Sequence, residues 1–106
     1  MEYTFTKENF DEEVLRSKEP VMIDFYADWC MPCRMMSPAV AKLAAKYDGR
    51  VKIGKVDSDR NPELTAKYGV MSIPNFVFIK DGKAVDHAIG AMPKAMLEKK
   101  LQQLLE

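Results

Sequence analysis

The spacing of apolar residues changes repeatedly along the chain, between a strand-like and a helix-like pattern. Short apolar or alternating runs predict five strands, at residues 3–5, 21–26, 51–56, 75–80 and 83–89. Apolar residues three and four positions apart predict four helices, at residues 10–18, from 32 or 33 to 47, 61–68 and 93–106. The order β-α-β-α-β-α-β-β-α predicts an α/β fold, with parallel crossovers, a final antiparallel hairpin and helices on both faces of the sheet.

Turn-forming residues mark several of these boundaries. Asn61 and Pro62 predict a helix start, with the asparagine as cap and the proline in the first turn. Asp81-Gly82 between two strands predicts a tight hairpin. Pro38 lies inside the second helix, where we expect a kink.

Composition and charge limit the classes of function. Sixteen basic and sixteen acidic side chains cancel, and no block of five like charges occurs, so we expect neither nucleic acid nor an anionic membrane as partner. No apolar stretch approaches the roughly 18–20 residues of a membrane span. The chain opens Met1-Glu2-Tyr3 without a basic or apolar leader, so we expect a cytoplasmic protein. With no repeat, low-complexity tract or linker, residues 1–106 are expected to form a single domain. The sequence does not indicate the oligomeric state, and we take a monomer as the default.

The two cysteines of the chain, Cys30 and Cys33, stand between a predicted strand and a predicted helix. In a reducing compartment such a pair is more often catalytic or metal-binding than structural. A helix N-terminus favours the thiolate through its dipole and its free N–H groups. We expect the Cys30 sulfur to be exposed and Cys33, about one helical turn further on, to be more buried.

A zinc site is the alternative interpretation of the cysteine pair. Structural zinc takes four ligands, whereas the chain offers two cysteines and the distant His87, which we expect at the surface. A zinc site shared between two chains, to which each chain contributes its two cysteines, stays open. Residues 57–59, Asp-Ser-Asp, lack the twelve-residue pattern of a calcium loop.

The segment around the cysteines, Phe25-Tyr26-Ala27-Asp28-Trp29-Cys30-Met31-Pro32-Cys33, closely resembles the active-site signature of thioredoxins, Trp-Cys-x-Pro-Cys, in which x is usually glycine. The resemblance continues in Lys55-Val56-Asp57, Tyr68-Gly69-Val70, Ser72-Ile73-Pro74, Asp81-Gly82 and Gly90, in the family's order and over nearly the whole chain. It implies a thioredoxin fold, in which four helices flank a central mixed five-stranded sheet.

The same resemblance implies the activity. We expect a protein disulfide reductase that acts by dithiol–disulfide exchange, with Cys30 as nucleophile, Cys33 as resolving thiol and a redox disulfide between them. Its partners would be disulfide-containing client proteins and a thioredoxin reductase that recycles it. No bound cofactor is implied.

Asp24 interrupts an apolar strand, and from the residues alone it could equally lie on a wetter strand face. Lys55, taken alone, would more often extend its ammonium group to water. The resemblance implies a joint answer, in which a buried Asp24 lies beneath the cysteines with Lys55 nearby. Asp24 would then take the proton from Cys33 as Cys33 attacks the mixed disulfide.

Pro74 could be a simple strand-start proline, and Trp29 a core aromatic residue. The resemblance implies instead a cis Ile73–Pro74 bond against the active-site sulfur, where the Ile73 backbone pairs with an extended substrate peptide. Trp29, Gly90 and Ala91 would line the same groove.

Methionines account for the main departures from the family pattern. Met31 replaces the usual glycine, and Met71 and Met92 lie in loops expected to flank Cys30; Asn75 replaces the usual threonine after Pro74. Eight methionines can fill a core, particularly Met22 and Met96, or form a methionine-rich rim that adapts to varied partners. Met31, Pro32 and Met71 are therefore included in the expected substrate-binding set.

Two other functions stay open. One is a redox-insensitive binding module or assembly subunit that uses the same groove. The other is a thiol oxidase or isomerase, which would require a more oxidising potential. Oxidising relatives tend to carry a histidine where this chain has Pro32, so the uncharged proline favours a reductase.

Overall fold

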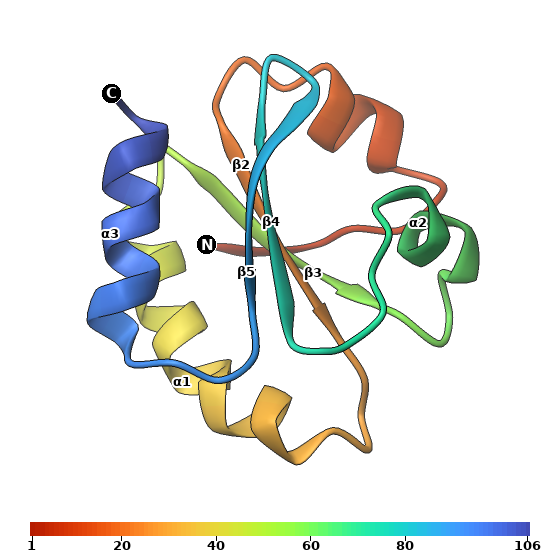
Figure 1. Cartoon of the computed structure of the whole chain (residues 1–106). Coiled ribbons are helices and arrows are strands. Elements are labelled where there is room, and N and C mark those ends of the chain that lie inside the picture. Colours follow the sequence, from red (N-terminus) through yellow and green to blue (C-terminus); the bar gives the residue numbers. More distant parts are fainter.

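The computed structural model describes residues 1–106 and contains a mixed five-stranded sheet with four helical segments (Figure 1). The strands are β1 (Glu2–Thr4), β2 (Val21–Tyr26), β3 (Lys52–Asp57), β4 (Asn75–Lys80) and β5 (Lys83–Ile89). The helices are η1 (Asp11–Leu15), α1 (Met31–Lys46), α2 (Pro62–Lys67) and α3 (Lys94–Leu104). The α/β fold predicted from the sequence is confirmed, and every predicted element is present.

The central strand of the sheet is β2. The strand order is β1-β3-β2-β4-β5, in which β1 and β2 run parallel to β3, and β4 is antiparallel to both β2 and β5. Because β2 has a neighbour on each side and helices above and below, Val21 to Phe25 are all buried. This explains why β2 is almost continuously apolar in sequence.

Helices cover both faces of the sheet (Figure 1). On one face, α1 and α3 pack over Met22 and Ile53, through residues such as Val40, Leu43 and Leu101. On the other face, η1 and α2 pack over Ile23, Phe25 and Val77, through Phe10, Val14 and Leu64. Since side chains alternate along β2, Asp24 points to the same face as Met22, beneath α1.

Two local predictions were wrong. The first helix is a short π-helical turn rather than a helix reaching Lys18, because the Arg16 N–H donates to the Asp11 carbonyl five residues back. The predicted start of α2 is confirmed, with Asn61 at the N-cap position and Pro62 as the first helical residue, but the Asn61 side chain makes no capping hydrogen bond. Its side chain instead accepts from the Lys7 N–H and donates to the Asp57 carbonyl, which ties two loops to the helix start.

Other local predictions are confirmed. Asp81 and Gly82 have φ angles of +53° and +76°, the left-handed backbone that a two-residue hairpin of this twist requires. Helix α1 continues through Pro38, whose missing N–H leaves the Arg34 carbonyl without its usual helical donor. The kink expected at Pro38 stays a prediction. None of the helices combines the length and apolar character needed to cross a membrane.

Candidate active site

The cysteine pair lies where β2 ends and α1 begins, at the carboxyl end of the central strand. Cys30 and Cys33 form a disulfide. Cys30 is the N-cap of α1, with extended backbone, and its Sγ accepts the Cys33 N–H at 3.2 Å. The cysteine sulfur therefore takes the place that a serine or aspartate oxygen takes in an ordinary helix cap.

The expected contrast in exposure between the two cysteines is not found. Cys30 is 4% exposed and Cys33 is 6% exposed, so both are buried in the disulfide form. Cys30 packs with Ala27 against the partly buried Ile73, and its Sγ lies 3.9 Å from the Ile73 carbonyl oxygen. The prediction failed because it treated the helix start as a free end, whereas the loop before β4 covers it.

The loop that covers Cys30 contains the Ile73–Pro74 peptide bond, which is cis. Pro74 is buried, and its carbonyl accepts the Gly90 N–H at 2.8 Å. Ile73, Pro74 and Gly90 therefore lie together beside the disulfide, and Ala91 follows as an exposed residue. Asn75, the first residue of β4, is buried with no hydrogen-bond partner for its Oδ1.

Trp29 is a surface residue and not part of the core, with 70% of its surface exposed. Its Nε1 donates to Asp59 Oδ2 at 2.8 Å. Sequence reasoning missed this role of Asp59. The available signal was that Asp59 follows β3, whose carboxyl end lies beside that of β2 in a parallel pair.

Asp24 is buried, at 4% exposure, so the wet-face interpretation was wrong. It pairs with Lys55 across β2 and β3. Burial raises the pKa of Asp24 to about 7; the negative charge of Glu2 also raises it, and the Lys55 ammonium lowers it. Lys55 is partly buried, and its Nζ lies 5.1 Å from the centre of the Tyr26 ring.

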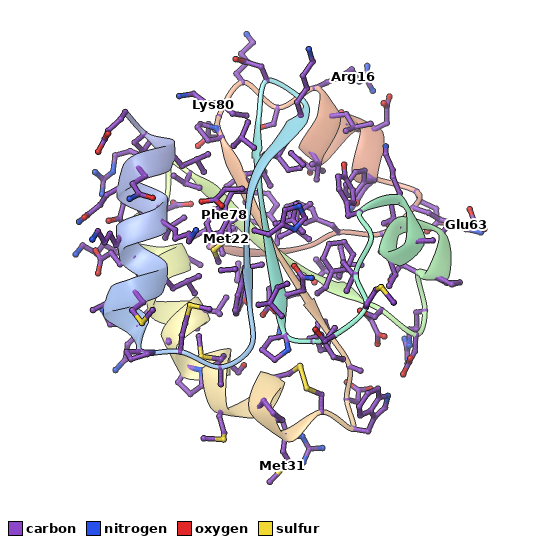
Figure 2. The ribbon with its side chains drawn as sticks, viewed as in Figure 1. Arg16, Met22, Met31, Glu63, Phe78 and Lys80 are labelled. Carbon is purple, nitrogen blue, oxygen red and sulfur yellow. A yellow bond between two sulfur atoms is a disulfide. The ribbon has the colours of Figure 1, made fainter.

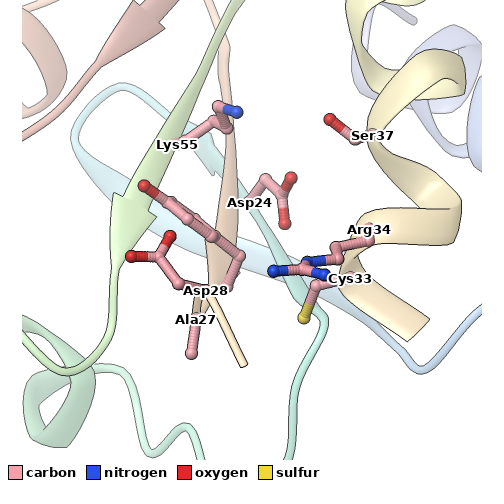
Figure 3. Close-up of a pocket in the computed structure, with 8 residues that line it drawn as sticks. Asp24, Ala27, Asp28, Cys33, Arg34, Ser37 and Lys55 are labelled. Atoms are coloured by element: carbon pink, nitrogen blue, oxygen red, sulfur yellow. The ribbon is translucent and has the colours of Figure 1, made fainter. Parts of the chain in front are cut away.

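A cleft of about 420 Å³ opens between β2, β3 and α1 (Figure 3). Its lining residues are Asp24, Tyr26, Ala27, Asp28, Cys33, Arg34, Ser37 and Lys55. Asp24 and Cys33 thus face one cleft from different elements, and the cleft is wide enough for water. Sequence reasoning missed Arg34, Ser37 and Asp28, which carry no signal beyond their closeness to the cysteines.

Several exposed methionines surround the cysteine turn. Met31 extends into solvent at the start of α1 (Figure 2), Met35 is exposed one turn later, and Met71 is 96% exposed. Single exposed apolar side chains are common on protein surfaces, so exposure alone does not assign these methionines a function. Met31 and Met71 are therefore accessible to a partner, and the methionine rim expected from the sequence stays a prediction.

The remaining methionines divide between core and surface. Met22 fills the core as expected, but Met96 is exposed, so its prediction as a core residue was wrong. Met36, in contrast, is buried in α1. Met92 is only partly exposed, and its N–H donates to the Met36 sulfur.

The chain offers too few ligands for Cys30 and Cys33 to belong to a metal site within one chain. No group of three or more His, Cys, Asp or Glu side chains could hold a metal ion. His87 is exposed on β5, at the opposite edge of the sheet from β1.

A family model described as thioredoxin matches residues 2–103. The chain belongs to the thioredoxin family. It is 44% identical to thioredoxin 1 of a Nostoc species over 94% of both chains, and 44% identical to thioredoxin 2 of Chlorobaculum tepidum over 92% of this chain and 90% of that protein. A chloroplastic M-type thioredoxin of Pisum sativum is 43% identical over 92% of this chain and 56% of its own length. With its disulfide-forming Cys30–Cys33 pair, this family member is a thiol–disulfide oxidoreductase.

Asp24 is expected to lower the stability of this thioredoxin-family chain as the pH rises. Its folded-state pKa is about 7, against an ordinary value of 3.8, so between these values the folded state binds more protons than the unfolded state. Stability is therefore lost as pH rises from 4 to 7. Asp24→Asn should be more stable than the parent by roughly 2–4 kcal/mol at pH 8 and nearly equal to it at pH 4, in urea unfolding of the oxidised protein.

Asp28→Asn is the matched control, since it makes the same chemical change at an exposed position of the same cleft. If the stability gain of Asp24→Asn were the same at pH 4 and pH 8, burial of an ionising Asp24 would not be its cause.

Proposed function

We propose that this chain reduces disulfides in client proteins, with Cys30 as the attacking thiolate and Cys33 as the resolving thiol. The Cys30 thiolate attacks one client sulfur, a mixed disulfide forms, and the other client sulfur leaves as a thiolate. Cys33 then loses its proton and attacks Cys30 Sγ, which releases the second client sulfur. Two electrons pass to the client, and Cys30 and Cys33 end as the disulfide seen in the structure.

The different surroundings of the two sulfurs support this division of roles. Cys30 Sγ accepts the Cys33 N–H at the start of α1, a position that favours a thiolate. It also lies next to the Ile73 carbonyl, where a client chain would arrive. Cys33 lines the cleft that it shares with Asp24. This asymmetry is the observation that carries the proposal.

Asp24 is proposed as the acceptor of the Cys33 proton. A carboxylate with a pKa of about 7 can both take and return a proton near neutral pH, which an ordinary aspartate does poorly. It faces the same cleft as Cys33, so water can carry the proton between them. Lys55 lies opposite Asp24 on the paired strand, where its positive charge would stabilise the Asp24 carboxylate when the proton has left.

The client groove is proposed to follow the loops around Cys30. Ile73 and the cis Pro74 would present backbone groups to an extended client segment, and Gly90, bonded to Pro74, keeps the neighbouring loop against them. Trp29 and Ala91 would form the walls. The Met31 and Met71 side chains, with Pro32 between the cysteines, would add an adaptable apolar rim.

After each turnover the chain is oxidised and needs two electrons. We propose that a thioredoxin reductase supplies them and that the chain acts as an electron carrier without a bound cofactor. The reaction requires a reducing compartment such as the cytoplasm. A monomer suffices, because every group proposed here belongs to one chain. The uncharged Pro32 before Cys33 supports reduction over oxidation, since no histidine charge stabilises the thiolate there.

Single cysteine substitutions test the exchange itself. Cys33→Ser should accumulate a mixed disulfide between Cys30 and a client such as insulin, because resolution is blocked. Cys30→Ser should form none and should lose turnover by at least about a hundredfold. The readouts are non-reducing electrophoresis with mass spectrometry and the rate of disulfide reduction.

A redox-insensitive binding module would keep its client affinity and its cellular role in Cys30→Ser. Trapping of clients through Cys33 rather than Cys30 would contradict the division of roles.

Substitution of Asp24 tests the proton transfer. In Asp24→Asn, resolution of a preformed mixed disulfide should slow by roughly tenfold or more at pH 7, and the pH dependence centred near 7 should disappear. Stopped-flow measurement of client release from pH 5 to pH 9 gives the profile. An identical pH profile in the parent and in Asp24→Asn would contradict the proposed role of Asp24.

The methionine rim is tested by replacing Met31, Met71 and Met92 together with alanine. We expect kcat/KM to fall by about three- to tenfold for several protein disulfides, because apolar contact with the client is lost. A small aromatic disulfide, which does not reach the rim, should react at the parent rate.

The Met31/Met71 double variant is the control for packing, since Met92 is partly buried against the core. Unchanged turnover across all protein substrates would refute the rim.

A further inference from the structure

Glu2 is a charged residue in an unexpected setting. It begins β1 and is partly buried, and its Oε2 is fully buried without any hydrogen-bond partner. The amino group beside it, that of Met1, pairs with Asp48 and with the Ala44 carbonyl of α1 instead. A buried carboxylate oxygen without a donor costs stability, so its presence calls for an explanation.

The sheet register places Glu2 on the same face as Asp24. Glu2 pairs with Ile53 and Ile53 with Met22, while two residues further along Thr4 pairs with Lys55 and Lys55 with Asp24. Paired residues of neighbouring strands point to the same face. Glu2 and Asp24 therefore both lie beneath α1, separated by β3.

Lys55 is not the only charged residue that affects the pKa of Asp24. After burial, the charge of Glu2 makes the larger contribution to the pKa of Asp24 and exceeds the opposing effect of the Lys55 ammonium. The other titratable or charged groups around the cleft are Tyr26, Asp28, Cys33 and Arg34. The charge of Glu2 therefore opposes the effect of the Lys55 ammonium on the pKa of Asp24.

We propose that Glu2 is a positioning residue for the disulfide exchange, acting through Asp24: its carboxylate, held on the same face of the sheet, makes Asp24 a stronger acceptor for the Cys33 proton. Glu2 itself takes no proton in this step. The proton passes from Cys33 to Asp24 as the Cys33–Cys30 bond forms and the bond between Cys30 and the client breaks. The inference rests on the proposed role of Asp24 as proton acceptor.

The first test is the titration of the Asp24 carboxyl carbon by NMR in the oxidised full-length protein. Glu2→Gln, which keeps the size and removes the charge, should move the Asp24 midpoint to lower pH by about 0.5 of a pH unit. Glu12→Gln is the matched control, because it makes the same change at an exposed position on η1, on the opposite face of the sheet, and should leave the midpoint unchanged. An unmoved midpoint in Glu2→Gln would overturn the inference.

The second test is the pH profile of mixed-disulfide resolution. Glu2→Gln should shift this profile to lower pH, in step with the Asp24 titration, and should have no further effect in an Asp24→Asn background. An equal effect in that background would show a merely structural role and refute the inference.

Comparison with Asp24→Asn alone separates the two proposals. If Asp24→Asn leaves the profile unchanged, the proton acceptor role fails and the inference fails with it. If Asp24→Asn abolishes the pH dependence while Glu2→Gln changes nothing, the inference alone is overturned.

Discussion

The pairing of β2 on both of its edges is the constraint on which the rest of the site depends. Through β3 it sets Lys55 opposite Asp24, and through β4 it sets Asn75 opposite Phe25, so that the cis Pro74 arrives beside the end of β2. The same strand leads into the turn that starts α1 with Cys30. One strand therefore positions Asp24, the disulfide and the loop that covers it.

The central position of β2 places a carboxyl group where its charged form is disfavoured. A strand buried on both faces is ordinarily apolar throughout, yet Asp24 stands in its middle. Removing a carboxylate from water disfavours its charged form, which is why its pKa rises to about 7. The burial that lowers stability also gives Asp24 a pKa near neutrality, which the proposed proton transfer from Cys33 needs.

Much of the fold follows from local patterns in the sequence. The period-2 and period-3.6 runs predicted the position of every strand and helix, though not the length and type of the first helix, and Asp81-Gly82 predicted its hairpin, because these depend on neighbouring residues alone. The length of the first helix was wrong for a local reason, the bond from the Arg16 N–H to the Asp11 carbonyl, but two other wrong predictions involve distant partners. The Asn61 side chain bonds to Lys7, which lies 54 residues away in sequence, in place of its own helix. Cys30 is covered by Ile73, from a loop 43 residues later.

The candidate site shows the same division. The Cys30–Cys33 pair at a strand-to-helix junction, and its redox chemistry, could be read from spacing and from the resemblance to thioredoxins, which also implied Asp24, Lys55 and the cis Pro74. Only the tertiary structure decided that Asp24 is buried, that Trp29 bonds Asp59, and that Glu2 shares a face with Asp24. The physical reason is that secondary structure and thiol chemistry arise from short-range order. Burial and charge coupling instead depend on which strands become neighbours, and β1, β2 and β3 meet only once the sheet has formed.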